Sequence, residues 1–183
     1  MEREEMKNLL DAIIEAKYKQ NTFLYREPIR PRPGPPATTN GLRQLDKHLE
    51  DLGLVAPSSY LMALSIYDGI EHFLGKGYSL LSVSEVIAGK QDFFPEDLEE
   101  FPDCCQFVIA AGKDPGFMGF DKSSSTSDGG YELVEVSPEG AEWRLKNFDD
   151  FLIEYLSVLK KSIEAEEKDR ENLTDGDSPS EER

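Results

Sequence analysis

Hydrophobic positions near the start of the chain recur with the spacing of an amphipathic helix. These positions are Met6, Leu9, Leu10, Ile13 and Ile14. They fall on one face of a helix with 3.6 residues per turn. The proline-rich stretch from Pro28 to Pro36 excludes regular helix and favours an extended connector. We expect its arginines to dock on acidic groups of the same chain; they are Arg26, Arg30 and Arg32.

Two further helices follow the connector. Thr38 or Thr39 is a suitable N-cap for the first, and Gly53 is a suitable stop. Its apolar stripe consists of Leu42, Leu45, Leu49 and Leu52. The next helix is predicted within APSSYLMALSIYDG, where Pro57 suits the first turn and Gly69 suits a left-handed residue at the end.

The periodicity changes after Gly69, and this change predicts a sheet. A short strand at Tyr78–Leu81 leads to a helix in which Ser82 and Glu85 have the spacing of a capping box. Further strands are predicted in CCQFVIAAG, GFMGFD, GGYELVEV and AEWRL. Their close spacing favours antiparallel pairing, so we expect an α+β fold with an antiparallel sheet packed against several helices.

The last helix has the clearest apolar face. Asn147 is its predicted cap, and the face consists of Phe148, Phe151, Leu152, Tyr155, Leu156, Leu159 and Ile163. From Glu164 onward the chain is charged and has no aromatic residue, which predicts a frayed or disordered acidic tail. The resulting division is an N-terminal helix and connector at 1–34, a domain at 35–163 and a tail at 164–183.

The acidity of the chain restricts its partners. The 183 residues carry a formal net charge of −17, whereas a nucleic-acid-binding surface needs a basic stripe. We therefore expect no direct nucleic-acid partner, and a basic protein partner fits better. No apolar run has the length of a membrane span and no secretory signal is evident, so the sequence predicts a cytoplasmic protein without membrane contact.

Recognisable catalytic and metal-binding motifs are absent from the sequence. It contains no HExxH, GxSxG, Walker-type loop or strand-linked GxGxxG. Cys104 and Cys105 are interpreted as structural thiols rather than zinc ligands, because adjacent cysteines lack the spacing of a zinc-binding pair. We expect no metal, no cofactor and no catalysis. His72 beside Glu71 is a general-base candidate without an evident nucleophile, and the serine-rich stretch Ser123–Gly130 is interpreted as a hairpin loop.

Several fragments occur in the order typical of one protein family. They are PPATTNGLRQLDKHLEDLGLVAPSSYLMALSIYDG, YSLLSVSEV, FPDCCQFVIAAGKDPGFMGFD and NFDDFLIEYL. Together they resemble the SUKH superfamily over about Pro35 to Leu159. The sequence departs from the usual pattern at Val55–Pro57, Ala63 and Asn147, which are packing and capping positions.

This resemblance implies an α+β domain and a role in protein binding. Bacterial members commonly act as immunity proteins that bind a cognate polymorphic or contact-dependent toxin, often a nuclease or another basic protein. Some eukaryotic members act as regulatory scaffolds. Two alternatives to toxin neutralisation stay open: a regulatory or scaffold domain unrelated to toxins, and a small-ligand binder or enzyme using a cleft near His72, Asp121 and the serine-rich stretch.

Two acidic patches are the predicted partner-binding surface. The first interleaves carboxylates with aromatic side chains and consists of Asp92, Phe93, Phe94, Glu96, Asp97, Glu99, Glu100 and Asp103. The second lies near the glycine and serine loops and consists of Asp114, Asp121 and Asp128. A basic toxin would meet carboxylates there in place of the phosphates of its substrate.

Overall fold

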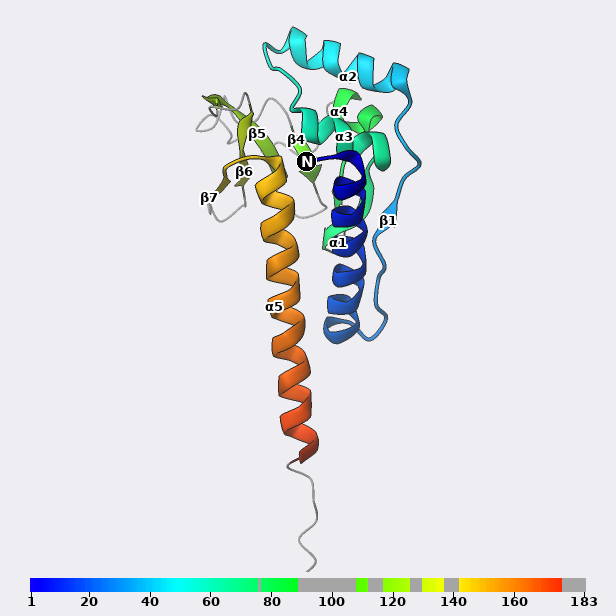
Figure 1. Ribbon diagram of the computed structural model, residues 1–183, viewed down its shortest axis with the longest axis vertical. Coiled ribbons are helices and arrows are strands. Elements are labelled where there is room, and N and C mark those ends of the chain that lie inside the picture. Colours follow the sequence, from blue (N-terminus) through cyan, green and yellow to red (C-terminus); the bar gives the residue numbers. More distant parts are fainter. Residues whose placement is uncertain (76, 89–107, 112–116, 126–129, 137–141, 176–183) are drawn as a thin grey trace, which may run out of the picture.

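Two long helices lie side by side and form the stem of the molecule. The computed structural model describes residues 1–75, 77–88, 108–111, 117–125, 130–136 and 142–175. Helix α1, Arg3–Leu24, and helix α5, Phe148–Asp175, are neighbours in the stem and run in the same direction (Figure 1). No helix in these ranges is both long and apolar enough to cross a membrane.

The shorter helices gather at one end of the stem. They are α2, Thr39–Asp51, α3, Ser58–Ile66, and α4, Val83–Ala88 (Figure 1). The strands are β1, Arg32–Pro33, β2, Ile70–Gly75, β3, Tyr78–Leu80, β4, Val108–Ala111, β5, Phe117–Ser125, β6, Tyr131–Val136, and β7, Glu142–Leu145. These strands pair in chain order, each antiparallel to the next. The predicted α+β class with an antiparallel sheet is therefore confirmed.

An aromatic cluster joins the helices to the sheet. Tyr60 of α3 is fully buried and meets Phe120 of β5 edge-to-face at 5.6 Å and Phe148 of α5 at 5.4 Å. Phe73 of β2 lies 5.6 Å from the ring of Tyr155, whose hydroxyl donates to the Phe73 carbonyl. Aromatic pairs of this geometry contribute about 0.5–1.5 kcal/mol each beyond simple burial, so α3 and α5 are fixed on the same face of the sheet.

The helix caps predicted from the sequence are present. Thr38 Oγ1 accepts from Gly41 N at 3.0 Å, and Asn147 Oδ1 accepts from Asp150 N at 2.8 Å. Ser82 N donates to Glu85 Oε2 at 3.0 Å while Ser82 Oγ accepts from Glu85 N at 3.4 Å. Pro57, expected inside the first turn of α3, is instead its N-cap residue. Each side-chain cap satisfies backbone N–H groups that a helix start leaves without partners.

The N-terminal helix shares the core of the domain. Met6, Leu10, Ile13 and Ile14 are buried in the same cluster as Tyr60 and the residues of α5. Two arginines of the connector pair within the chain as expected: Arg30 with Glu15, and Arg32 with Glu71 at 3.9 Å. Residues 1–34 are thus integrated into the fold rather than attached beside it.

Helix α5 continues past the point where the sequence predicts a disordered tail. Residues 164–175 are helical, so the expectation of disorder from Glu164 is wrong for this stretch. Contacts with α1 give the reason: Lys19 forms an ion pair with Glu167 at 2.6 Å, and the Arg170 guanidinium lies 4.5 Å from the ring centre of Phe23. These cross-helix contacts add to the helix propensity of a segment that is rich in Glu and contains Ala and Lys.

Strands β1 and β2 are not predicted by the hydrophobic pattern. Strand β2 includes His72 at φ 59°, and its pairing register with β3 shifts between Ile70 and Gly75. This irregularity breaks the simple alternation that identifies a strand. Strand β1 contains Pro33, which an edge strand tolerates because its outer side needs no N–H donor.

A tight backbone junction binds the connector to the end of α3. Gly34 N donates to Gly69 O at 2.9 Å, and Asp68 N donates to Pro35 O at 2.8 Å. A Cβ at Gly34 would lie 2.4 Å from the Asp68 carbonyl oxygen. Gly69 has φ +83° and a Cβ there would lie 2.9 Å from Ser82 N, so both positions require glycine.

We therefore expect Gly34→Ala to lower the free energy of unfolding by about 1–3 kcal/mol, because the added methyl forces backbone to move. Gly75→Ala is the matched control, since nothing lies within 4 Å of a Cβ at that position. Its effect should stay within about 0.5 kcal/mol. Urea unfolding of the two variants and the parent protein measures both effects. Equal stability of the two variants would contradict the close approach at Gly34.

Candidate partner-binding surface

The structure describes one of the eleven predicted partner-binding residues. Asp121 lies on β5, while the others fall outside the described residues: Asp92, Phe93, Phe94, Glu96, Asp97, Glu99, Glu100, Asp103, Asp114 and Asp128. Cys104 and Cys105 also fall outside these residues. The role of the first acidic patch stays a prediction.

Asp121 forms a network on the face of the sheet opposite the aromatic cluster. Phe120, Leu133 and Leu145 share one row across β5, β6 and β7, and their alternating neighbours Val134 and Arg144 point the other way. On that second face Arg144 Nη1 donates to Asp121 Oδ2 at 2.6 Å and to Glu132 Oε2 at 3.2 Å. Two carboxylates therefore share one guanidinium group.

Short-range donors also hold Asp121 in place. Its Oδ1 accepts from Ser123 N at 2.9 Å and from Ser123 Oγ at 2.6 Å. Burial by itself raises the pKa of Asp121, but the hydrogen bonds from Ser123 and the ion pair with Arg144 outweigh it and hold the pKa below its usual value of 3.8. Asp121 is consequently an ionised, buried anchor that links β5 to β7 across β6.

The exposed members of this network are Glu132 and Arg144. The Asp121 side chain is 4% exposed, whereas the Arg144 and Glu132 side chains are 43% and 37% exposed. Sequence reasoning selected Asp121 and missed the other two. Only the strand register brings these three residues together, and that register is not visible in local sequence spacing. A partner that approached this face would contact Glu132 and Arg144 rather than the buried Asp121.

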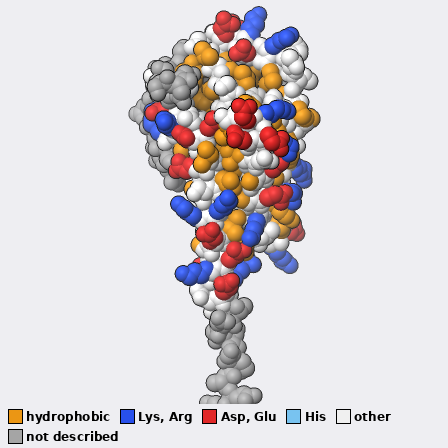
Figure 2. All heavy atoms as spheres, in the orientation of Figure 1, with side chains coloured by type: hydrophobic (Ala, Val, Ile, Leu, Met, Phe, Trp, Pro, Cys, Tyr) orange, Lys and Arg blue, Asp and Glu red, His pale blue; other side chains and the backbone are white. Residues whose placement is uncertain are grey.

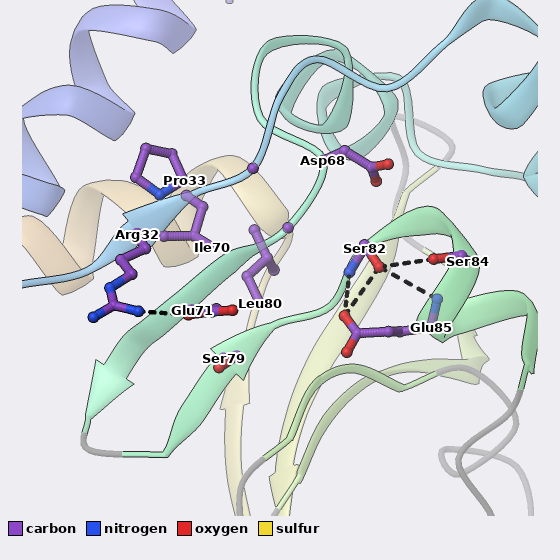
Figure 3. Close-up of a pocket in the computed structure, with 12 residues that line it drawn as sticks. Arg32, Pro33, Asp68, Ile70, Glu71, Ser79, Leu80, Ser82, Ser84 and Glu85 are labelled. Atoms are coloured by element: carbon purple, nitrogen blue, oxygen red, sulfur yellow. Dashed lines mark hydrogen bonds and ion pairs between the residues drawn. The ribbon is translucent and has the colours of Figure 1, made fainter.

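A cavity of about 520 Å³ lies at the other edge of the sheet (Figure 3). Its walls come from three separated segments that the Gly34–Asp68 junction holds together: 32–34, 68–71 and 79–85. In Figure 3 Arg32 and Glu71 face each other on neighbouring strands, and Ser82, Ser84 and Glu85 form a hydrogen-bonded group at the start of α4. The volume is in the range of about 300–1,000 Å³ typical of ligand pockets.

Oxygen acceptors dominate the polar lining of this cavity. Its carboxylates belong to Asp68, Glu71 and Glu85, and among the described residues that line it Arg32 alone has a cationic side chain. Asp68 Oδ1 accepts from Val83 N at 2.7 Å, and Glu85 Oε2 accepts from Ser82. Glu71 is different, because its side chain is 65% exposed and its distance to Arg32 is 3.9 Å. Glu71 is therefore the carboxylate most accessible to a ligand.

His72 makes two hydrogen bonds within the β2–β3 hairpin. Its Nδ1 accepts from Gly77 N at 2.9 Å and its backbone N donates to Ser79 Oγ at 3.1 Å. Both contacts close the β2–β3 hairpin around the positive φ of His72. Residues 123–125, predicted to lie in a loop, extend β5 instead. The Nδ1 atom of His72 is thus engaged in the hairpin.

Charged side chains of both signs are interspersed on the face drawn in Figure 2. Hydrophobic side chains emerge among them along the stem (Figure 2). Within the described ranges, no group of three or more His, Cys, Asp or Glu residues is placed to hold a metal ion. Two features of the described surface place charged groups where a ligand could reach them, the Arg144 network and the edge cavity.

No protein-family model matches the chain, and no curated protein matches it either.

The Asp121 network predicts a pH-dependent contribution to stability. Since folding lowers the pKa of Asp121 from its usual value of 3.8, its contribution to stability is present above that value and is lost as the pH falls through the folded pKa. At pH 7 we expect Asp121→Asn to lower the free energy of unfolding by about 1–3 kcal/mol. At a pH below the folded pKa of Asp121 the difference from the parent protein should shrink.

Denaturant unfolding at the two pH values measures this difference. Glu50→Gln on the exposed side of α2 is the control and should differ little from the parent protein at either pH. An Asp121→Asn cost that is equal at neutral and at acidic pH would show that the charge of Asp121 does not stabilise the fold.

Proposed function

We propose that this chain is a non-catalytic, acidic protein-binding domain that acts as a cytoplasmic immunity protein of the SUKH type. Its ligand is a cognate polymorphic or contact-dependent toxin with a basic surface, such as a nuclease. Binding occludes the surface with which the toxin engages its substrate. The chain needs no cofactor for this role, because inhibition by occlusion requires only a stable complex.

The surplus of carboxylates is the observation that carries this proposal. The sequence has 37 acidic and 20 basic residues, and the same imbalance occurs at both described surface features. Two carboxylates face Arg144, and three carboxylates accompany Arg32 in the edge cavity. A surface of this sign attracts a cationic protein and disfavours a polyanion such as nucleic acid.

Electrostatic complementarity acts on the rate of encounter and on the choice of partner. Opposite charges on two proteins steer diffusional encounter, and salt screens this attraction over about 8–10 Å. Carboxylates that are already held in position, as Glu132 is by Arg144, need little reordering when a partner cation arrives. Prepositioned anions of this kind favour a long-lived complex because less conformational entropy is lost on binding.

The predicted first acidic patch can be tested by neutralising four of its residues together. The variant carries Glu96→Gln, Asp97→Asn, Glu99→Gln and Glu100→Gln. We expect it to associate about tenfold more slowly at low salt with the toxin domain encoded beside this chain's gene. Stopped-flow association rates at several salt concentrations measure the effect. The association rate of the parent protein should fall steeply as the salt concentration increases, whereas the association rate of the variant should fall less.

A control with the same change in net charge separates the patch from the charge of the whole chain. It is Glu27→Gln, Asp46→Asn, Glu50→Gln and Asp51→Asn, all at exposed positions, and it should slow association less than the patch variant. A rate independent of salt in the parent protein would contradict the electrostatic mechanism. Failure of the chain to protect cells that express the toxin domain, or the absence of such a neighbouring gene, would instead favour a scaffold role.

A further inference from the structure

We propose that the edge cavity, formed by segments 32–34, 68–71 and 79–85, is a binding site for an arginine side chain of the protein partner. The identity of the ligand as part of a basic protein rests on the proposed function. The choice of a guanidinium ligand rests on the residues that line the cavity. Glu71 would bind the guanidinium, and neighbouring oxygen atoms would accept its remaining hydrogen bonds.

The lining of the cavity matches a ligand rich in hydrogen-bond donors. The residues that line the cavity include the acidic Asp68, Glu71 and Glu85 and the hydroxyl-bearing Ser79 and Ser84. An arginine side chain offers five N–H donors and no acceptor, and its planar fork binds a carboxylate through two parallel hydrogen bonds. A phosphate or a carboxylate ligand would instead meet three negative groups, which disfavours it.

Glu71 is the residue best placed to bind the incoming guanidinium. Its side chain is 65% exposed, and the Arg32 side chain is 77% exposed and separated from it by 3.9 Å. At that distance the two groups attract each other without a close, two-point hydrogen bond. The pair therefore leaves room for a partner arginine to bind Glu71 more closely, and Arg32 competes with that arginine.

The frame of the cavity is fixed before any ligand arrives. The Gly34–Gly69 and Asp68–Pro35 hydrogen bonds hold two of its walls together, at 2.9 and 2.8 Å. The third wall continues into α4, whose first residue Val83 donates from its backbone N to Asp68 Oδ1 at 2.7 Å. Binding an arginine in this frame requires ordering of the exposed side chains alone, which lowers the entropic cost.

The experiment uses the whole chain and a defined probe, the amide of N-acetyl-arginine. We expect millimolar binding, seen by NMR as shifts at the backbone amides of Gly34, Glu71 and Ser79. Glu71→Gln should weaken the probe about two- to fivefold, the range of an exposed ion pair. Arg32→Gln should strengthen probe binding by a similar factor, because this variant lacks the cation that competes for Glu71 and repels the probe. Glu50→Gln on α2 is the charge-matched control and should leave binding unchanged.

The corresponding citrulline amide tests whether charge matters, since it keeps the shape of arginine without its charge. Equal binding of the two amides, shifts scattered over the surface, or weaker binding to Arg32→Gln would overturn the site. Measurement with the toxin domain separates this proposal from the proposed function. Probe binding without toxin binding supports the site and contradicts the immunity role. Toxin binding that Glu71→Gln leaves unchanged contradicts the site and supports that role.

Discussion

The close approach of Gly34 to the Asp68 carbonyl is the constraint on which the rest of the structure depends. A methyl group at Gly34 would lie 2.4 Å from that oxygen, so no residue with a side chain fits there unless the backbone moves. Hydrogen bonds at this junction join the proline-rich connector to the segment between α3 and β2. The side chain of Asp68 also accepts a hydrogen bond from the backbone of Val83 at the start of α4. Segments that are distant in sequence meet there, and they enclose the edge cavity.

Local sequence signals predict the helices well and the site poorly. The spacing of Met6, Leu10 and Ile13 specifies α1, and the Ser82–Glu85 pair specifies the start of α4, because both depend on residues one turn apart. Within the helical stretch 164–175, Arg170 contacts Phe23 of another helix, and such a contact has no local sequence signal. The Asp121–Arg144 pair and the edge cavity likewise arise from strand register and chain crossing, which no local pattern encodes.

The two surface features share one chemical character although they lie at different places on the sheet. At each, an arginine of the chain is outnumbered by carboxylates, and buried backbone or side-chain contacts hold some of those carboxylates in position. Asp121 anchors its network from inside while Glu132 and Arg144 reach solvent. A fold that holds its anions in fixed positions at the surface is suited to receive cations from another protein.

The most direct test of this account is amide hydrogen exchange of the chain with and without the basic protein partner that the proposed function requires. Binding through carboxylate-rich surfaces predicts slower exchange in the complex at residues 92–103 and along Ile70–Leu80, with little change on the stem formed by α1 and α5. Protection confined to that stem, or no protection at all, would contradict the account.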